Sequence, residues 1–262
     1  MEAAKYKIVI IGSGNVATHL GLALKKSNHS IVQVYSLHKS SAGKLAKVLK
    51  CEYITECLKI DKSADIYIIA VNDDAIQKVV TQLRLDEKIV VHTSGSVEMD
   101  ILKPSSKNYG VFYSLQTFSK NSKVDFKTIP ICIEANNATT LKVLMAIAKS
   151  ISGNVQKINS EQRKSIHLAA VFANNFSNHL YTIASAILSS ANVSLDILKP
   201  LIEETARKIK NSPPNETQTG PAIRDDKKTI NNHLKMLSNK KEYQKLYSLM
   251  SKSIIEFNNG KK

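Results

Sequence analysis

The sequence predicts an α/β protein: a doubly wound, mostly parallel sheet followed by a smaller all-helical domain. Three observations favour this fold class. Short runs of β-branched residues alternate with helical patterns through the first half of the 262-residue chain, as in parallel sheets that helices cover on both faces. A glycine-rich turn joins the first expected strand to the first expected helix. No strand pattern follows residue 158.

The first domain is expected to span residues 1–158. Its strands are short apolar runs bounded by polar or turn residues: Tyr6–Ile11, Ile31–Tyr35, Tyr53–Thr55, Ile66–Val71, Ile89–His92, Tyr109–Leu115, Pro130–Glu134 and Val155–Ile158. Its helices have apolar residues at helical spacing: Asn15–Lys26, Ser41–Leu49, Asp73–Leu83, Val97–Leu102 and Ala138–Ser150.

The second domain is expected to span residues 159–262. The segment Asn211–Gly220, NSPPNETQTG, has the proline, serine, asparagine and glycine content of a loop. The patterns on either side of this loop indicate helices, of which the first is one long helix. The expected helices are Ser160–Ser190, Asp196–Lys210, Asp225–Leu237 and Lys240–Phe257.

Composition argues against several classes of protein. The net charge is +15, but the excess is almost all lysine, spread over every element. We interpret it as a solvated surface rather than a nucleic-acid site, and it would still attract anionic ligands. The longest apolar stretches are shorter than the roughly 18–20 residues of a membrane-spanning helix. The three cysteines form no CxxC pair, so we expect no disulfide framework, no metal site and a cytoplasmic location.

The segment Gly12–Ala17, GSGNVA, lies between the first strand and the first helix. It matches the GxGxxA form of the dinucleotide-binding fingerprint of Rossmann folds. Gly12 allows the tight turn, Gly14 lets the backbone approach a pyrophosphate, and Ala17 allows close helix packing. Free N–H groups and the positive helix end then face the phosphates. We therefore expect a phosphate site at Gly12, Ser13, Gly14, Asn15 and Val16. A glycine turn in a fold that binds no nucleotide is the alternative.

The end of the second expected strand indicates which dinucleotide binds. A site for NAD usually has Asp or Glu here, about 20 residues past the fingerprint, to bind the ribose hydroxyls. This chain has Ser36, His38 and Lys39 instead. A small hydroxyl and basic groups suit the 2′-phosphate of NADP, so we expect NADP (NADPH) rather than NAD. The alternative is a polar loop in a lysine-rich protein.

Two loops follow further strands, at the edge where open α/β sheets bind ligands. In the first loop, Val71 and Asn72 are expected to line the cofactor groove, and Asp73 to cap the next helix. The second loop has the sequence HTSGS. We expect Thr93 at the cofactor and Ser94 beside the nicotinamide, although Ser94 or Ser96 could equally be a helix cap.

A polar stripe follows the first expected helix of the second domain. On a helical wheel, Asn174 and Asn178 fall within about 40° of His167. Amide and imidazole groups suit a semi-buried cleft, and a polar network between helices is the alternative. Histidine can act as a general acid near neutral pH, so we predict His167 as acid/base, with Asn174 and Asn178 as orienting donors. Ser94 is predicted near the developing charge, and His92 is a second candidate acid.

A third candidate segment is the loop Thr217–Asp225, TQTGPAIRD. It has more special backbone residues than a plain linker needs. Arg224 could clamp a carboxylate or a phosphate. It could as easily pair with Asp225 or Asp226, and the sequence leaves both possibilities open.

Together the motifs GSGNVA, AVNDDAI, HTSGS, GVFYSLQTFSK, IHLAAVFANNFSNHL and TGPAIRDD resemble those of Rossmann-like proteins, often labelled NADP oxidoreductases, that carry a C-terminal helical domain of unknown function (number 2520). More distantly, the chain is similar to pyrroline-5-carboxylate reductases, deazaflavin-dependent NADP reductases and β-hydroxyacid dehydrogenases. The resemblance covers nearly the whole chain. It implies an NADP-binding domain and a helical domain that builds the substrate cleft and a homodimer interface.

One departure limits the resemblance. β-Hydroxyacid dehydrogenases place a catalytic Lys and an Asn four residues apart on the first helix of the second domain, whereas here Leu168 follows Lys164 at that spacing. We therefore do not expect this chain to use the catalytic residues and mechanism of those dehydrogenases. We expect an NADP-dependent oxidoreductase that passes a hydride between nicotinamide and a C=O or C=N group of a small polar substrate. The alternative is a non-catalytic dinucleotide sensor.

Overall fold

The computed structural model describes residues 4–119 and 123–260. The chain divides into two compact units, residues 1–173 and 174–262. The last strand ends at Lys157, close to the expected domain boundary at residue 158, but the following residues up to Ala173 belong to the first unit. The division between residues 158 and 159 stays a prediction.

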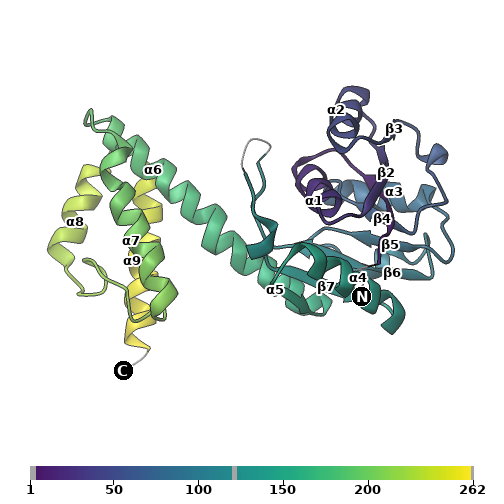
Figure 1. The fold of residues 1–262 in the computed structure, drawn as a ribbon. Coiled ribbons are helices and arrows are strands. Elements are labelled where there is room, and N and C mark those ends of the chain that lie inside the picture. Colours follow the sequence, from purple (N-terminus) through teal and green to yellow (C-terminus); the bar gives the residue numbers. More distant parts are fainter. Residues whose placement is uncertain (1–3, 120–122, 261–262) are drawn as a thin grey trace. The chain divides into compact units, whose positions relative to one another are not determined.

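The first unit is built on one eight-stranded sheet with the order β3-β2-β1-β4-β5-β6-β7-β8 (Figure 1). Every neighbouring pair is parallel except β6 and β7, which are antiparallel. The predicted doubly wound, mostly parallel sheet is confirmed. The strands are β1 (Lys7–Ile11), β2 (Ser30–Tyr35), β3 (Glu52–Ile54), β4 (Ile66–Ile69), β5 (Ile89–His92), β6 (Asn108–Ser114), β7 (Ile131–Ala135) and β8 (Val155–Lys157).

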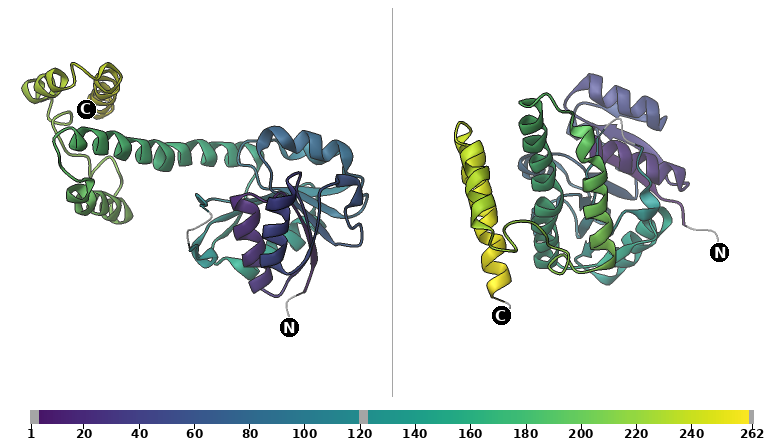
Figure 2. Two further views of the ribbon diagram at one scale, coloured as in Figure 1. Left: turned by 90° about the horizontal axis from the view of Figure 1, so that it is seen from above. Right: turned by 90° about the vertical axis from the view of Figure 1, so that its left-hand side faces the viewer.

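Helices cover both faces of this sheet (Figure 1, Figure 2). Apolar side chains of α1, α2 and α4 form one core with the sheet, and α3 packs in a second core. The expected helix Val97–Leu102 is wrong in type, because only a short 3₁₀ turn forms there. The helices are α1 (Asn15–Lys26), α2 (Lys39–Leu49), α3 (Asp73–Gln82), α4 (Ala138–Ile151) and α5 (Ser160–Ala170), with 3₁₀ turns η1 (Cys57–Lys59), η2 (Met99–Leu102) and η3 (Phe126–Thr128).

The second unit is helical in all its described elements, and none of these is a strand. The expected single α-helix from Ser160 to Ser190 is wrong in one respect: the π-helical segment η4 (Val171–Phe176) separates α5 from α6. A π turn bonds each N–H five residues back instead of four, so it changes the angular position of every later side chain. The elements are α6 (Ser177–Ser189), η5 (Leu195–Leu198), α7 (Lys199–Asn211), α8 (Lys227–Met236) and α9 (Lys241–Asn259).

Few side chains of the second unit are buried. Among its described residues only Ala222 and Ser251 are buried, and neither is fully so, although the helices carry many large apolar side chains. Along the described parts of the chain, no helix is both long and apolar enough to cross a membrane. The expected cytoplasmic location stays a prediction.

Helix α5 is fixed to the sheet by a fully buried arginine. A capping box at Asn159 starts the helix, in which Asn159 and Gln162 exchange side-chain and backbone hydrogen bonds. One turn later, Nε of Arg163 donates to Oε2 of Glu134 on β7 at 3.3 Å. Arg163 has no exposed surface, and Ser160 also donates to Glu134, at 2.6 Å. Burial is tolerated because the two charges are paired and hydrogen-bonded.

We predict that Arg163→Met destabilises the protein by about 3–5 kcal/mol, since it leaves the carboxylate of Glu134 buried without its cation. The matched control is Lys107→Met, which breaks an ion pair with Glu87 whose side chains are 76% and 68% exposed. Exposed pairs contribute about 0–1 kcal/mol. The free energy of unfolding from urea titration measures both changes. Equal losses in the two variants would show that the buried pair does not anchor α5.

Candidate functional site

The predicted phosphate loop begins at a glycine that no other residue can replace without strain. Gly12 has a φ of 120°, a conformation that side-chain-bearing residues rarely adopt. A Cβ on Gly12 would lie 2.1 Å from the carbonyl oxygen of Ala70. Its N–H donates to the carbonyl of Tyr35 at 2.7 Å. The turn is therefore held between the ends of β1, β2 and β4.

The next glycine is exposed to open space instead. Gly14 occupies the N-cap position of α1, no side chain caps the helix, and its first turn has no acidic residue. A Cβ on Gly14 would meet nothing within 4 Å, so packing within the protein does not require glycine here. The side chain of Asn15 donates to the carbonyl of Phe118 at 2.8 Å. The backbone N–H groups of Asn15 and Val16 lie in the first turn of α1, at the positive end of the helix dipole. Such N–H groups can donate to a pyrophosphate.

The end of β2 is brought to this loop. The hydroxyl of Ser13 donates to that of Ser36 at 2.8 Å, which joins two predicted cofactor residues that lie 23 positions apart. His38 occupies the N-cap position of α2, and Lys39 is its first residue. Both are exposed, while Ser36 is half-buried. A hydroxyl and two basic side chains thus lie near the phosphate loop.

The loop after β4 differs from expectation at one residue. Asn72, not Asp73, occupies the N-cap position of α3, so the predicted cap at Asp73 is wrong. The carboxylate of Asp73 accepts a hydrogen bond from the hydroxyl of Ser96 at 2.5 Å. Asn72 is exposed and Val71 half-buried. Asp73 therefore connects the loop after β4 to the loop after β5.

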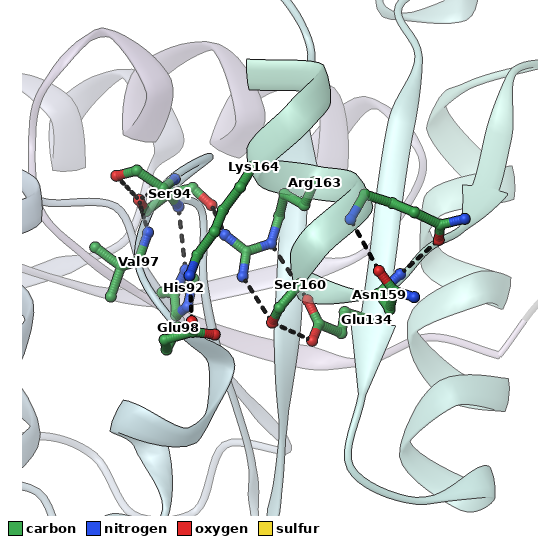
Figure 3. Close-up of polar contacts among 11 residues, drawn as sticks. His92, Ser94, Val97, Glu98, Glu134, Asn159, Ser160, Arg163 and Lys164 are labelled. Carbon is green, nitrogen blue, oxygen red and sulfur yellow. Dashed lines mark hydrogen bonds and ion pairs between the residues drawn. The ribbon is translucent and has the colours of Figure 1, made fainter. Parts of the chain in front are cut away.

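The HTSGS turn after β5 is held by several hydrogen bonds (Figure 3). The hydroxyl of Ser94 accepts from the N–H groups of Ser96 and Val97, both at 3.1 Å. The carbonyl of Ser94 accepts from Nη1 of Arg163 at 3.1 Å. The N–H of Thr93 donates to the carbonyl of Ile69 on β4 at 3.1 Å. The side chain of Ser94 thus acts as a cap of the turn, and its role at a developing charge stays a prediction.

His92 lies at the end of β5 beneath this turn. Its side chain is fully buried, and its Nδ1 accepts from the N–H of Ser94 at 3.2 Å. Burial, with the nearby charge of Arg163, lowers the pKa of His92 to about 4. The imidazole is neutral at physiological pH, so it holds no excess proton to donate there. This argues against His92 as the acid.

His167 on α5 lies against the same turn. A Cβ on Gly95 would approach Nδ1 of His167 to 2.6 Å, so only glycine lets the ring pack this closely. Nδ1 of His167 lies 3.1 Å from the hydroxyl of Tyr113 on β6. Sequence reasoning did not select Tyr113, although it lies in the motif GVFYSLQTFSK. The structure thus places Ser94, Gly95, Tyr113 and His167 at the carboxyl ends of β5 and β6.

The remaining predicted residues lie outside both the HTSGS turn and the phosphate loop. Asn174 and Asn178 lie in the second unit, beyond or within η4, where the wheel angles of an α-helix no longer apply. Their part in the site stays a prediction. Lys164 forms an ion pair with Glu98. Arg224 is exposed and has neither a hydrogen bond nor an ion pair to any described residue, which leaves its role open.

Comparison with known proteins adds to this geometry. A Rossmann-like domain matches residues 1–115, and the domain of unknown function DUF2520 matches residues 129–254. A crystal structure from Bacteroides fragilis, named as that of a putative NADP oxidoreductase, is 44% identical, covers 96% of this chain and 98% of its own, and has a TM-score of 0.89. No curated protein gives a significant match.

Two further solved structures share the fold at lower identity. Protein TM1727 from Thermotoga maritima is 23% identical over 97% of this chain and 99% of its own, with a TM-score of 0.73. An imine reductase from Myxococcus stipitatus, in complex with NADP⁺, is 14% identical over 95% and 93%, with a TM-score of 0.67. Pyrroline-5-carboxylate reductases also match.

The lowered pKa of His92 predicts a pH dependence of stability. The unfolded chain binds a proton at His92 below about pH 6.5, but the folded protein does so only near pH 4. Folding is therefore favoured above pH 6.5, and up to about 3 kcal/mol of stability is lost as the pH falls from 6.5 to 4.

Urea titrations at several pH values measure this loss. His92→Gln, which retains an acceptor for the N–H of Ser94, should flatten the curve over that window. The control His179→Gln, at an exposed position, should follow the wild type. Identical slopes for His92→Gln and the wild type would contradict the prediction.

Proposed function

Since the chain belongs to the family of Rossmann-like proteins that carry the domain DUF2520, we propose that it is an NADP-dependent oxidoreductase. The observation that carries the proposal is the uncapped N-terminus of α1. Gly12 shapes the turn there, and Gly14 leaves the approach to the backbone N–H groups open. An anionic pyrophosphate would complete hydrogen bonds that the protein itself does not supply.

The preference for NADP over NAD follows from the end of β2. Ser36 lies against Ser13 of the phosphate loop, and His38 and Lys39 are exposed beside it. This segment has no carboxylate to bind the ribose hydroxyls of NAD. A lysine and a hydroxyl offer charge-assisted hydrogen bonds to a 2′-phosphate. The name of the Bacteroides fragilis protein agrees with this preference.

The reaction proposed is hydride transfer to or from a C=O or C=N group of a small polar substrate. Bound NADPH supplies the hydride. His167 lies at the carboxyl ends of the central strands, where open α/β sheets bind their ligands, and it supplies or accepts the proton at the heteroatom. Asn174 and Asn178 are proposed to orient the substrate, and Ser94 to hold the turn beside it. The imine reductase among the similar structures acts on a C=N group by its name.

Thermal unfolding with no ligand, with NADH and with NADPH tests the cofactor. A ligand at about 100 times its dissociation constant adds roughly 2.7 kcal/mol and raises the midpoint by several degrees. We expect the larger shift with NADPH. No shift with either dinucleotide would contradict the proposed function.

Ser36→Asp tests the basis of the preference. The new carboxylate repels a 2′-phosphate and offers acceptors to ribose hydroxyls. NADPH affinity should fall about tenfold or more, as expected when a charge-assisted contact is lost, while NADH affinity holds or rises. Isothermal titration measures both constants. An unchanged NADPH affinity would remove Ser36 from the site.

His167→Ala tests the chemical step. On a panel of small carbonyl compounds and imines with NADPH, turnover should fall about 10²-fold or more because the proton donor is lost. NADPH affinity should stay within about twofold of the wild type, since the contacts of His167 are with Tyr113 and the turn after β5 rather than with the phosphate loop. Equal turnover would remove His167 from the mechanism. NADPH binding without turnover in the wild type would favour the sensor.

We also propose that the second unit forms a homodimer with a second copy of the chain. Its helices leave large apolar side chains exposed, among them Leu201 at 62% and Ile209 at 52% on α7. A unit that buries so little of its own apolar surface gains stability when a partner covers it.

Sedimentation equilibrium should give roughly twice the chain mass of 29.0 kDa. Leu201→Lys should shift the wild-type dimer toward monomer because a buried lysine at the interface costs desolvation energy. Val48→Lys on α2, at a position 52% exposed, is the matched control and should remain dimeric. A monomeric wild type would contradict the proposal.

A further inference from the structure

We infer that Tyr113 is a positioning residue: its hydroxyl donates to Nδ1 of neutral His167 and so holds the ring in the tautomer that carries its proton on Nε2. Nε2–H is then the group that faces the substrate. This inference rests on the proposed function, because it assigns the atom through which His167 acts. The pair joins β6 to α5 within the first unit.

The contact between the two rings is specific. Oη of Tyr113 lies 3.1 Å from Nδ1 of His167, and the rings meet edge to face with centroids 6.1 Å apart and planes at 78°. Tyr113 is buried at the end of β6, in a small apolar cluster with Val111 and Cys132 that Ile166 of α5 also packs against. Ile166 precedes His167, so the packing of α5 on this cluster brings the imidazole to the phenol.

Gly95 confines the ring on its other side. A Cβ at that position would lie 2.6 Å from Nδ1, 2.7 Å from Cγ and 3.0 Å from Cβ of His167. The imidazole therefore rests on the backbone of the HTSGS turn with Nδ1 turned toward Tyr113. That turn is itself fixed by the buried guanidinium of Arg163, through the carbonyl of Ser94. Both boundaries of the ring thus belong to the first unit.

The direction of the hydrogen bond follows from the chemistry of the phenol. Burial raises the pKa of Tyr113 above its ordinary value, so the hydroxyl keeps its proton and needs an acceptor. Nδ1 of His167 is the acceptor that the structure provides. A neutral imidazole that accepts at Nδ1 carries its proton on Nε2. Among the described residues, none forms a hydrogen bond with Nε2, so this N–H remains available.

Tyr113 and His167 can also form a hydrogen bond when the imidazole is protonated. When His167 is protonated, Nδ1–H donates to Oη of Tyr113, because a hydroxyl can accept as well as donate. In reduction the N–H bond at Nε2 of the protonated ring would break and its proton would pass to the substrate oxygen or nitrogen, while the hydride that bound NADPH supplies would add to carbon. The neutral ring would then hold its proton on Nδ1, and uptake of a proton from water at Nε2 with release of the Nδ1 proton to water would restore the tautomer in which Tyr113 donates to Nδ1. Nε2 is therefore the nitrogen that exchanges a proton with the substrate.

The tautomer can be read in solution without cofactor or substrate. Long-range ¹H–¹⁵N spectra of the histidine rings, recorded on the full chain at about pH 8, distinguish a protonated ring nitrogen from a bare one. His167→Gln assigns the signals. We expect protonated Nε2 and bare Nδ1 at His167 in the wild type. In Tyr113→Phe the two ¹⁵N shifts should converge as the other tautomer becomes populated.

A second variant and a matched control separate positioning from general damage. Gly95→Ala pushes the ring off the turn and should change the His167 signals while Tyr113 is still present. The chain holds a second pair of the same kind, with Nδ1 of His233 2.8 Å from the hydroxyl of Tyr247. Tyr247→Phe should change the signals of His233 and leave those of His167 unchanged.

Two outcomes would overturn the inference: a wild-type His167 with its neutral proton on Nδ1, or unchanged His167 shifts in Tyr113→Phe. Neither measurement involves a dinucleotide, so the two proposals can fail independently. Absence of NADPH binding would contradict the oxidoreductase proposal but would not change the tautomer observed at His167.

Discussion

The geometry of the candidate site depends on one fully buried guanidinium. Arg163 pairs with Glu134 on β7 and donates to the carbonyl of Ser94 in the turn after β5. A single side chain thereby connects the start of α5, an antiparallel strand and the HTSGS turn. Because a buried charge is costly without its partners, these elements are stable only when they come together. The position of His167, one helical turn further along α5, follows from that anchor.

The site has two parts along one edge of the sheet, and they use the backbone in different ways. At the phosphate loop, Gly12 forms the tight turn and Gly14 faces open space, so the backbone N–H groups at the start of α1 remain for an anion. At the turn after β5, both serine hydroxyls and several backbone groups are already bonded within the protein, and Gly95 gives the His167 ring room. The first arrangement favours binding of a charged ligand. The second favours a rigid ring held in one orientation.

The distribution of charge also differs between the protein surface and the HTSGS turn. The chain carries a net charge of +15, which raises the local concentration of anionic ligands such as dinucleotides. Two cations beside the HTSGS turn are nevertheless paired: Arg163 with Glu134 and Lys164 with Glu98. Burial also keeps His92 neutral. The basic surface therefore acts over a distance, while these two cations beside the turn are neutralised by their partners.

Local sequence determined most of the fold. Alternating apolar runs and helical spacing indicate the strands and helices close to their observed bounds, and the GSGNVA turn is defined by residues that are neighbours in the chain. These signals depend on φ and ψ preferences and on side-chain periodicity, which a short segment expresses by itself. The same reasoning failed where periodicity changes within a helix. The π segment before α6 alters the angles on which the alignment of His167 with Asn174 and Asn178 was based.

Tertiary structure alone decided the contacts between distant residues. Tyr113 meets His167 across 54 positions, Ser13 meets Ser36 across 23, and Arg163 meets Ser94 across 69. No local pattern encodes these pairs, because each depends on how strands and helices pack. Packing between elements also explains three further features of the site. The hydroxyl of Ser94 accepts within its turn, Ser96 donates to Asp73, and burial lowers the pKa of His92. The sequence by itself determined which residues could do chemistry, and packing decided their partners and protonation, since burial and distance are properties of the folded chain.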